Sequence, residues 1–441
     1  MKRAFAFAAV VALALWAQAA VAGNVSLTIY NDNLALVRDV RNFSVNEGLN
    51  TLKVTDVAAL LDATSVHFKP LGGIGIDLLE QNFDYDLLSQ DKLLSKFIGE
   101  KITLVDDKGG RREVTLLSTS GGLIVDDSGK ILLNPAGKIE LPRLAGGLLL
   151  KPTLNWLVDA SKSGATDCEI SYLTTGLAWN ADYVFLLNKD DTAGDMEGWV
   201  TINNTSGATY EDAALKLIAG TIHRATAPQP LRMYADKAAE GGGGPGGFVE
   251  KPFFEYHIYE LGRPTTIRDN QTKQISLLTA ADIPAKKVYV AEESKVNVKV
   301  EFKNAKDQHL GIPLPQGRVR VFKRDDKDIP QFVGEDNIEH TPKDEQVRLT
   351  VGEAFDIKVT QTQTNYQDLG RGYRESWKVS IRNHKDQDVV VIVPHHVYGD
   401  WRIVDESYKS KKTDAFTFEY AVPVKANAES TLNFTFEVVW Y

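Results

Sequence analysis

Apolar and polar residues alternate along most of this chain. Residues 25–30, 295–302 and 318–322 follow a period of two, with apolar side chains on one face and polar or charged ones on the other. This pattern is typical of antiparallel strands that have one buried and one solvated side. Turn-forming residues such as Asn46-Glu47-Gly48 separate the runs. The sequence therefore predicts a mainly β protein.

Two segments depart from this pattern and predict the few short helices. Residues 85–97 place apolar side chains at Leu87, Leu88, Leu93, Leu94 and Phe97, a spacing that favours a helix. Residues 57–61 are interpreted as a single helical turn.

Residues 98–150 hold five short strand-like runs separated by turns that are mostly rich in Gly and Asp. So many short strands within about fifty residues are typical of a small SH3-like barrel. A meander that extends a neighbouring sheet is the alternative interpretation.

One motif recurs along the chain. Strands that end in Lys-Asn or Arg-Asn occur at Asn304 and Asn383, each followed by Lys-Asp-Gln, and Asn204 ends a looser third copy. We interpret each Asn as a residue that tolerates the left-handed conformation of a tight turn. The spacing of roughly eighty to a hundred residues predicts tandem β-sandwich domains of immunoglobulin-like size.

These patterns divide the chain into seven predicted parts. They are a signal peptide (1–22), an N-terminal β domain (23–97), the small barrel-like insertion (98–150), a β region (151–225), a Gly- and Pro-rich linker or loop (226–251), a second β region (252–350) and a C-terminal immunoglobulin-like β-sandwich (351–441).

The N-terminus predicts export. Met1-Lys2-Arg3 is followed by an uncharged apolar run and then by Ala20-Val21-Ala22, the small-x-small pattern that precedes cleavage. The run is shorter than the ~20 residues that span a bilayer, and no second long apolar run follows. We therefore expect a periplasmic or secreted protein without a membrane span in its mature chain.

Composition narrows the classes of partner and of chemistry. The chain has 441 residues and a net charge of −9, and nucleic-acid binding needs a concentrated basic face, so we expect none. Its single cysteine, Cys168, cannot form an internal disulfide. We expect a buried, inert thiol whose pKa the neighbouring Asp167 and Glu169 raise.

Several runs together resemble a known family, the bacterial exported proteins that carry the domain of unknown function 4139. The runs are residues 171–183, 203–207, 214–220, Tyr256-His257-Ile258-Tyr259 with Arg263-Pro264, 269–273 and 310–321. The resemblance covers most of the mature chain but implies no settled activity. Some relatives contain a long coiled coil near the N-terminus, where this chain has the barrel-like stretch, so no function tied to that coil is expected.

The matched runs supply the candidate binding residues, which are Tyr256, His257, Tyr259, Arg263 and Trp179. For His257 we favour a satisfied polar strand residue over a catalytic base. Five aromatic residues are predicted to anchor sandwich cores, and any that prove exposed would indicate a binding face: Trp179, Tyr183, Trp199, Trp377 and Trp401.

No catalytic residue, metal site or cofactor is predicted. His395 and His396 are adjacent, so on a strand they point to opposite faces and are poorly placed to share one metal. The Asp-rich segments 190–197 and 325–328 lack the spacing of a calcium loop and are interpreted as turns.

The leading hypothesis is a non-catalytic exported protein that binds a partner protein or an envelope polymer through its β surfaces. The alternative is an extracytoplasmic hydrolase acting on glycan or peptide. A deep pocket with two or more buried ionisable groups near residues 256–268 would favour the hydrolase. A structural role in a surface layer or appendage is a third hypothesis.

Overall fold

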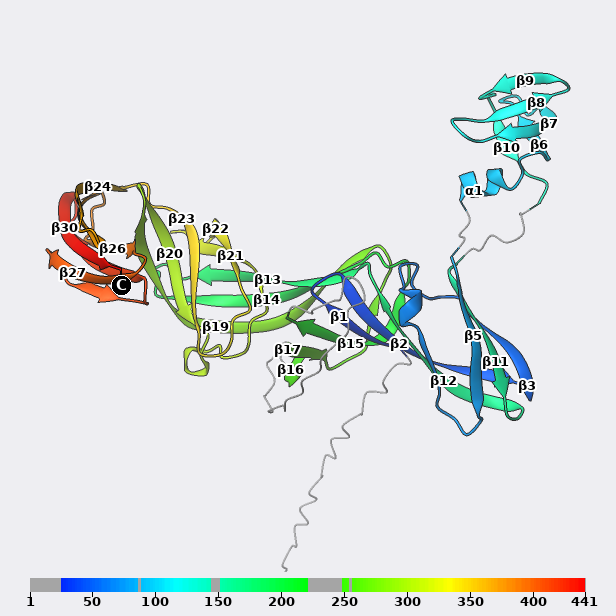
Figure 1. The fold of residues 1–441 in the computed structure, drawn as a ribbon, viewed down its shortest axis with the longest axis horizontal. Helices are drawn as coiled ribbons and strands as arrows, with labels where there is room; N and C mark the ends of the chain where they lie inside the picture. The colour runs from blue at the N-terminus through cyan, green and yellow to red at the C-terminus, as the bar shows by residue number, and fades with distance from the viewer. Residues whose placement is uncertain (1–24, 86–88, 144–150, 221–247, 254–255, 441) are drawn as a thin grey trace, which may run out of the picture.

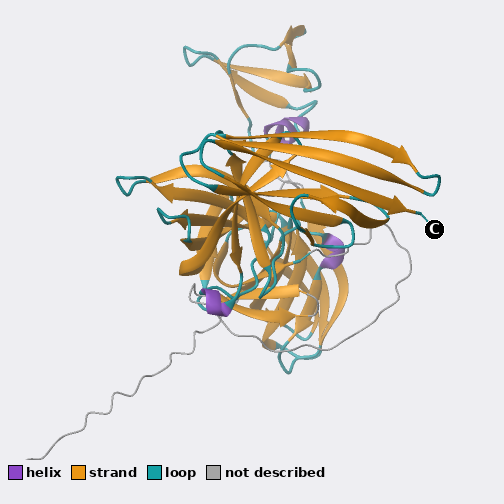
Figure 2. Ribbon diagram, turned by 90° about the vertical axis from the view of Figure 1, so that its left-hand side faces the viewer, coloured by secondary structure: helices purple, strands orange, loops and turns teal. Residues whose placement is uncertain are grey.

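The structure, a computed structural model, describes residues 25–85, 89–143, 151–220, 248–253 and 256–440. The predicted signal peptide and most of the predicted linker lie outside these ranges. Strands make up most of the described residues, and helices are few and short (Figure 2), which confirms the prediction of a mainly β protein. Within these ranges, no helix combines the length and apolarity that a membrane crossing requires.

An eight-stranded sheet joins distant parts of the chain (Figure 1). Its order is β16-β17-β15-β1-β2-β12-β4, and β18 pairs with β15. β1 lies parallel to β15, so that Leu27 is opposite Leu215. The strands are β1 (Val25–Tyr30), β2 (Leu34–Val45), β4 (His67–Pro70), β12 (Gly164–Thr174), β15 (Tyr210–Ala219), β16 (Phe248–Phe253), β17 (Tyr256–Leu261) and β18 (Thr265–Ile267).

A three-stranded sheet of order β3-β11-β5 belongs to the same core. Its strands are β3 (Gly48–Val54), β5 (Ile76–Asp84) and β11 (Thr153–Ala160). The indole of Trp156 is fully buried there, packs against Phe68 with ring centroids 5.1 Å apart and donates to Gln81 Oε1 at 2.9 Å. Segments on both sides of residues 98–150 therefore build one sheet.

The largest sheet has ten strands, in the order β22-β21-β13-β14-β19-β26-β29-β28, with β20 paired to β19 and β23. Its longest strand, β19, pairs with β14 near its start and with β20 near its end. The strands are β13 (Leu177–Leu187), β14 (Ala193–Asn204), β19 (Gln271–Glu292), β20 (Lys295–Lys303), β21 (Gly317–Arg324), β22 (Pro330–Ile338), β23 (Gln346–Glu353), β26 (Val389–His396), β28 (Ser410–Lys412) and β29 (Thr417–Val424).

A four-stranded sheet of order β24-β25-β30-β27 shares a second core with β26, β29, the end of β19 and the start of β20. Phe418 and Tyr420 on β29 pack there against Phe434 on β30. The strands are β24 (Ile357–Asp368), β25 (Gly372–Asn383), β27 (Asp400–Glu406) and β30 (Ala428–Val439).

The predicted barrel is a separate five-stranded sheet of order β10-β6-β7-β8-β9. Its strands are β6 (Lys101–Val105), β7 (Arg111–Ser118), β8 (Ile124–Asp127), β9 (Lys130–Leu133) and β10 (Lys138–Glu140). Barrel closure is not shown, because among the described residues no pairing joins the outer strands β9 and β10. Within the same ranges, none of the five strands pairs outside this sheet, so the meander does not extend a neighbouring sheet either.

The helices are shorter than expected. α1 (Gln90–Ser95) begins after Ser89, whose side chain accepts from Lys92 N, and its Leu94 joins the core of the five-stranded sheet. Residues 57–61 contain a hydrogen-bonded turn, in which Leu61 N donates to Ala58 O at 3.4 Å, but they are not assigned as a helix. The short 3-10 helices are η1 (Ala63–Ser65), capped by Asp62, and η2 (Lys306–Gln308). The predicted linker also ends too late, because β16 starts at Phe248 and pairs with β17.

The recurrent asparagines form a buried clamp rather than a left-handed turn. Asn204, Asn304 and Asn383 are almost fully buried, and none of them has a positive φ. Asn383 Nδ2 donates to the carbonyls of Gln387 at 2.9 Å and Lys425 at 3.0 Å, while Oδ1 accepts from Lys385 N at 3.0 Å. The proposed conformational reason was therefore wrong, although the echo marks a real structural unit.

The other two clamps follow the same plan. Asn204 Nδ2 donates to Ala208 O at 2.8 Å and to Arg268 O at 3.0 Å, and its Oδ1 accepts from Ser206 N at 3.0 Å. In both this clamp and the Asn383 clamp, the Asn side chain therefore bonds the residues two and four positions after it in the loop. Asn304 closes a longer loop, because Oδ1 accepts from Gly311 N at 3.0 Å and Nδ2 donates to Ile312 O at 2.7 Å. Each clamp ties a strand end to its own loop and to a distant segment.

Candidate functional site

Two of the candidate binding residues lie in the core. Trp179 on β13 and Tyr259 on β17 are each 2% exposed, with ring centroids 6.3 Å apart. The Trp179 indole donates to Ile218 O at 3.2 Å, and the Tyr259 hydroxyl donates to Pro313 O at 3.0 Å. Burial, and next the nearby Glu250, raise the pKa of Tyr259 far above its ordinary value. Both side chains thus hold the sheets together.

The remaining candidates lie nearer the surface. His257 Nδ1 is 2.6 Å from Oε1 of Glu250, a carboxylate that is almost fully buried. Tyr256 is half-buried on the same strand, and Arg263 is exposed in the turn after it. The structure brings Tyr256, His257 and Tyr259 together on β17 but leaves Arg263 outside that strand.

Among the other aromatic residues, Tyr183 is fully buried, as predicted. Trp377 and Trp401 are half-buried at the edge of the second core. Trp199 is 37% exposed, because on β14 it alternates with the buried Gly198 and Val200. The prediction of a core position is wrong for Trp199.

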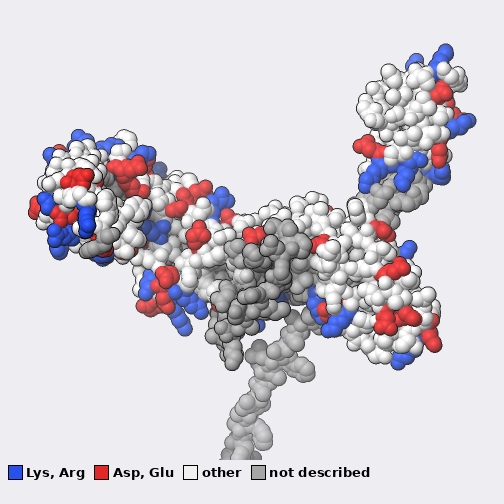
Figure 3. All heavy atoms as spheres, in the orientation of Figure 1, with Lys and Arg blue, Asp and Glu red and all other residues white. Residues whose placement is uncertain are grey.

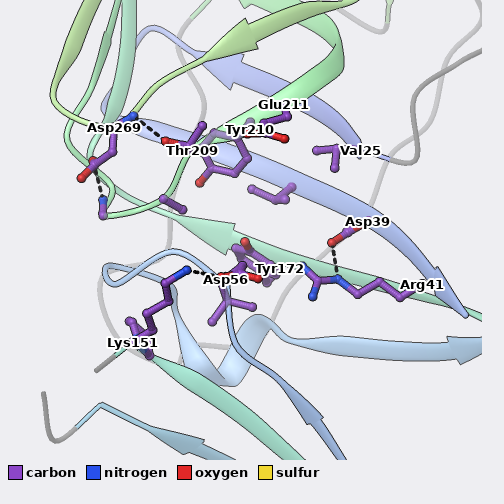
Figure 4. A pocket seen from close by; sticks show the side chains of 15 residues that line it. Val25, Asp39, Arg41, Asp56, Lys151, Tyr172, Thr209, Tyr210, Glu211 and Asp269 are labelled. Atoms are coloured by element: carbon purple, nitrogen blue, oxygen red, sulfur yellow. Dashed lines mark hydrogen bonds and ion pairs between the residues drawn. The ribbon is translucent and has the colours of Figure 1, made fainter. Parts of the chain in front are cut away.

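A cavity of about 580 Å³ opens where the eight-stranded sheet meets the start of β11 (Figure 4). Seven separate segments contribute to its walls. The lining residues are Val25, Val37, Asp39, Arg41, Asp56, Val57, Lys151, Pro152, Tyr172, Gly207, Ala208, Thr209, Tyr210, Glu211 and Asp269.

Two buried tyrosines lie side by side in this cavity (Figure 4). The Tyr172 hydroxyl accepts from Ala58 N at 3.3 Å, and the Tyr210 hydroxyl shares a hydrogen bond with Ser206 Oγ at 3.1 Å. Burial raises the pKa of Tyr172 to about 12 and shifts the pKa of Tyr210 further above its ordinary value. Both phenols are therefore neutral hydrogen-bonding groups at neutral pH.

The charged side chains around the tyrosines are mostly paired. Asp39 accepts from Arg41 Nε at 2.7 Å, and Asp56 accepts from Lys151 Nζ at 2.6 Å. Asp269 accepts from the backbone N–H of Gly207 at 3.0 Å. Glu211 is exposed and has no ion-pair partner among the described residues. The described residues thus give the cavity two phenols, two paired carboxylates and two carboxylates, Glu211 and Asp269, without an ion pair among them.

Backbone geometry fixes the loop at residues 205–208. Gly207 has φ +82°, and a Cβ there would lie 2.5 Å from that of Ala59. The loop also bonds to its neighbours, since Thr205 N donates to Gly176 O at 2.7 Å and Leu60 N donates to Ser206 O at 3.2 Å. Only glycine fits this combination of dihedral angle and close approach.

The sequence contained part of the signal for this cavity. Tyr172, Gly207 and Asp269 each belong to a different one of the runs singled out in the sequence analysis, and the fold brings the three runs together. Asp39, Asp56 and Lys151 belong to no such run, and nothing local in the sequence marks them.

The acidic turns and Cys168 are the remaining places where metal ligands could lie. Within the described ranges, no group of three or more His, Cys, Asp or Glu side chains is placed to hold a metal ion. Asp191, one of the acidic-turn residues, accepts hydrogen bonds from both Lys287 and Lys323. Cys168 is fully buried and its pKa is raised to about 11, which confirms the predicted burial and direction. The main cause is burial, with a smaller effect from Asp167, rather than the two acidic neighbours together.

Comparison with known proteins does not assign a function to this site. No family model matches the chain, and no curated protein matches it either.

Proposed function

We propose that this chain is an exported, non-catalytic binding protein of the bacterial envelope, related to proteins that carry the domain of unknown function 4139. Its cavity around Tyr172 and Tyr210 would bind a partner protein or an envelope polymer outside the cytoplasm. The predicted signal peptide motivates the compartment, and the resemblance of the runs that converge on the cavity motivates the family.

One observation carries the binding role. The cavity offers neutral phenols held at fixed positions, while Asp39 and Asp56 are neutralised by neighbouring cations. Such groups orient a ligand through hydrogen bonds. A general acid or base, in contrast, needs a group whose pKa lies near the operating pH.

We also propose that the sheets form tandem immunoglobulin-like sandwiches. The recurrence of the asparagine clamp at strand ends supports this organisation. The shared core between β24-β25-β30-β27 and β26-β29 supports it for the C-terminal part. Charges are mixed over the face drawn in Figure 3, which suits an envelope protein that stays dispersed rather than one that attracts polyanions.

A pull-down from envelope extract tests the binding role. The mature protein is compared with Glu211→Lys, which reverses a carboxylate of the cavity that has no ion pair among the described residues, and with the control Glu47→Lys, an exposed turn residue outside it. We expect the same envelope component with wild type and Glu47→Lys and its loss with Glu211→Lys. Equal recovery by all three proteins, or no recovery by wild type, would refute the cavity as the binding site.

The hydrolase remains a second candidate because four carboxylates line one cavity: Asp39, Asp56, Glu211 and Asp269. The test is incubation of the mature protein with peptidoglycan and with casein. Release of soluble fragments by wild type, lost in Glu211→Gln or Asp269→Asn while the fold is retained, would replace the binding role with hydrolysis.

A further inference from the structure

A second cavity, of about 770 Å³, lies between the β19–β20 turn and the C-terminal sheets. This volume is within the range of small-molecule sites. Its lining residues are Ala291, Glu292, Glu293, Ser294, Val359, Thr360, Gln361, Trp377, Pro394, His395, His396 and Thr417. None of them lines the cavity around Tyr172 and Tyr210.

The indole of Trp377 gives this cavity an aromatic surface. Trp377 is half-buried on β25, and its Nε1 donates to Glu375 Oε2 at 2.8 Å, which holds the ring in one orientation. Val359 and Pro394 add further apolar surface. An aromatic face held in this way attracts C–H groups, because its π-cloud carries partial negative charge.

His395 brings a half-buried imidazole to the same cavity. Its ring lies 5.1–5.4 Å from the ring centroids of Trp377, Phe418, Phe434 and Phe436. Neither ring nitrogen has a hydrogen-bond partner among the described residues. Because the side chain is half-buried at the cavity wall, its ring nitrogens are available to a partner that enters the cavity.

The protonation state of His395 defines what that partner must offer. Burial, with a smaller effect from His396, lowers the pKa of His395 to about 4, so the imidazole is neutral near pH 7. A neutral imidazole has one donor and one acceptor nitrogen. A hydroxyl group both donates and accepts, and therefore matches either tautomer.

The other polar groups exclude an anionic ligand. No Lys or Arg belongs to the described residues that line this cavity. Glu292 is already engaged by Lys299 and by Asn297, and Gln361 Nε2 donates to the backbone carbonyl of Glu293 at 2.9 Å. The hydroxyls of Ser294, Thr360 and Thr417 complete a polar rim around an apolar wall.

We propose that this cavity binds a neutral sugar unit of a glycan. A pyranose ring has one face of C–H groups, which would lie against Trp377, and hydroxyls around its edge, which would reach His395 and the rim. The proposal rests on the binding role proposed above and narrows the polymer to a glycan. It uses different residues, so the two sites can fail separately.

Calorimetric titration with four defined tetrasaccharides tests the proposal: the β-1,4 tetramer of N-acetylglucosamine, maltotetraose, cellotetraose and mannotetraose. Spermidine and the galacturonic acid tetramer serve as cationic and anionic probes. Ser294→Trp narrows the cavity from an exposed turn without touching the core, and Ser120→Trp, in the exposed turn between β7 and β8, is its matched control. His395→Gln removes the imidazole, and Glu211→Lys reports on the first cavity alone.

Saturable binding of at least one neutral tetrasaccharide is expected. Ser294→Trp should abolish it, and His395→Gln should weaken it about fivefold or more, as the loss of one hydrogen bond does. Ser120→Trp and Glu211→Lys should leave it unchanged. Three results would overturn the proposal. They are no binding of any neutral tetrasaccharide, binding that survives Ser294→Trp, and tighter binding of spermidine or the galacturonic acid tetramer than of every neutral tetrasaccharide.

Discussion

The asparagine clamp at Asn383 allows a sharp test of what holds the C-terminal sheets together. Replacement by Ala removes two donated hydrogen bonds, to Gln387 O and Lys425 O, and one accepted from Lys385 N. Each such bond contributes about 1 kcal/mol net, so Asn383→Ala should lower the free energy of unfolding of this region by about 3 kcal/mol. Asn383→Asp should cost at least as much, because a carboxylate oxygen would then face two carbonyls.

A local readout is needed, because a chain with several cores does not unfold in one step. Hydrogen exchange followed by mass spectrometry should show faster exchange in β25, β26 and β30 in Asn383→Ala, with β1, β2 and β15 unchanged. Asn204→Ala should instead speed hydrogen exchange in β1, β2 and β15 and leave β25, β26 and β30 unchanged, since its clamp ties β14 to the segment after β18. In urea, the transition of the affected region should shift by about 1–3 M, given slopes of about 1–3 kcal/mol/M.

The control is Asn365→Ala, an exposed residue of β24. Its replacement should change stability by less than about 0.5 kcal/mol. If Asn383→Ala is no more destabilising than Asn365→Ala, or if exchange rises uniformly across the chain, the clamp does not stabilise the sheets in the way proposed here.

Three further predictions follow from buried side chains. Burial lowers the pKa of His395 to about 4, so between about pH 6.5 and pH 4 the unfolded state binds a proton that the folded state does not. The free energy of unfolding should therefore fall by about 2 kcal/mol over that window. Urea unfolding compared at pH 7 and pH 4.5 should show this fall in wild type but not in His395→Gln. Trp156→Ala should cost about 4 kcal/mol, through a cavity beside Phe68 and the unpaired Gln81, and a loss below about 1 kcal/mol by calorimetry would contradict its place in the core. Cys168, buried and with a pKa of about 11, should react with a thiol reagent only in denaturant, and fast labelling of the native protein would disprove its burial.

The sequence predicted the fold class well because strand formation leaves a local trace. Period-two alternation at residues 25–30 and 295–302 appears as β1 and β20, since each strand must alternate between core and solvent wherever its partners lie. The asparagine echo was also visible locally. The structural role of the asparagine was not visible locally. Two of the three main hydrogen bonds at Asn383 are to residues within four positions of it, but the third is to the distant Lys425.

Local patterns failed where the outcome depended on distant partners. Trp199 falls on the outward face because of the register of β14 against β13 and β19. The five-stranded sheet is not shown as a closed barrel because closure is a property of strand pairing, which turn residues do not encode. Likewise Phe248 begins a strand because β17 provides a partner, although a Gly-rich run precedes it.

By itself, the sequence determined that the described chain is made mostly of strands, and it located several of them, such as β1 and β20. The tertiary structure alone decided which strands are neighbours and therefore which side chains meet. β1 pairs with β15, and the first cavity gathers residues from Val25 to Asp269. The physical reason is that sheet hydrogen bonds join backbones without regard to separation in sequence, so the sites built at their edges carry no local signature.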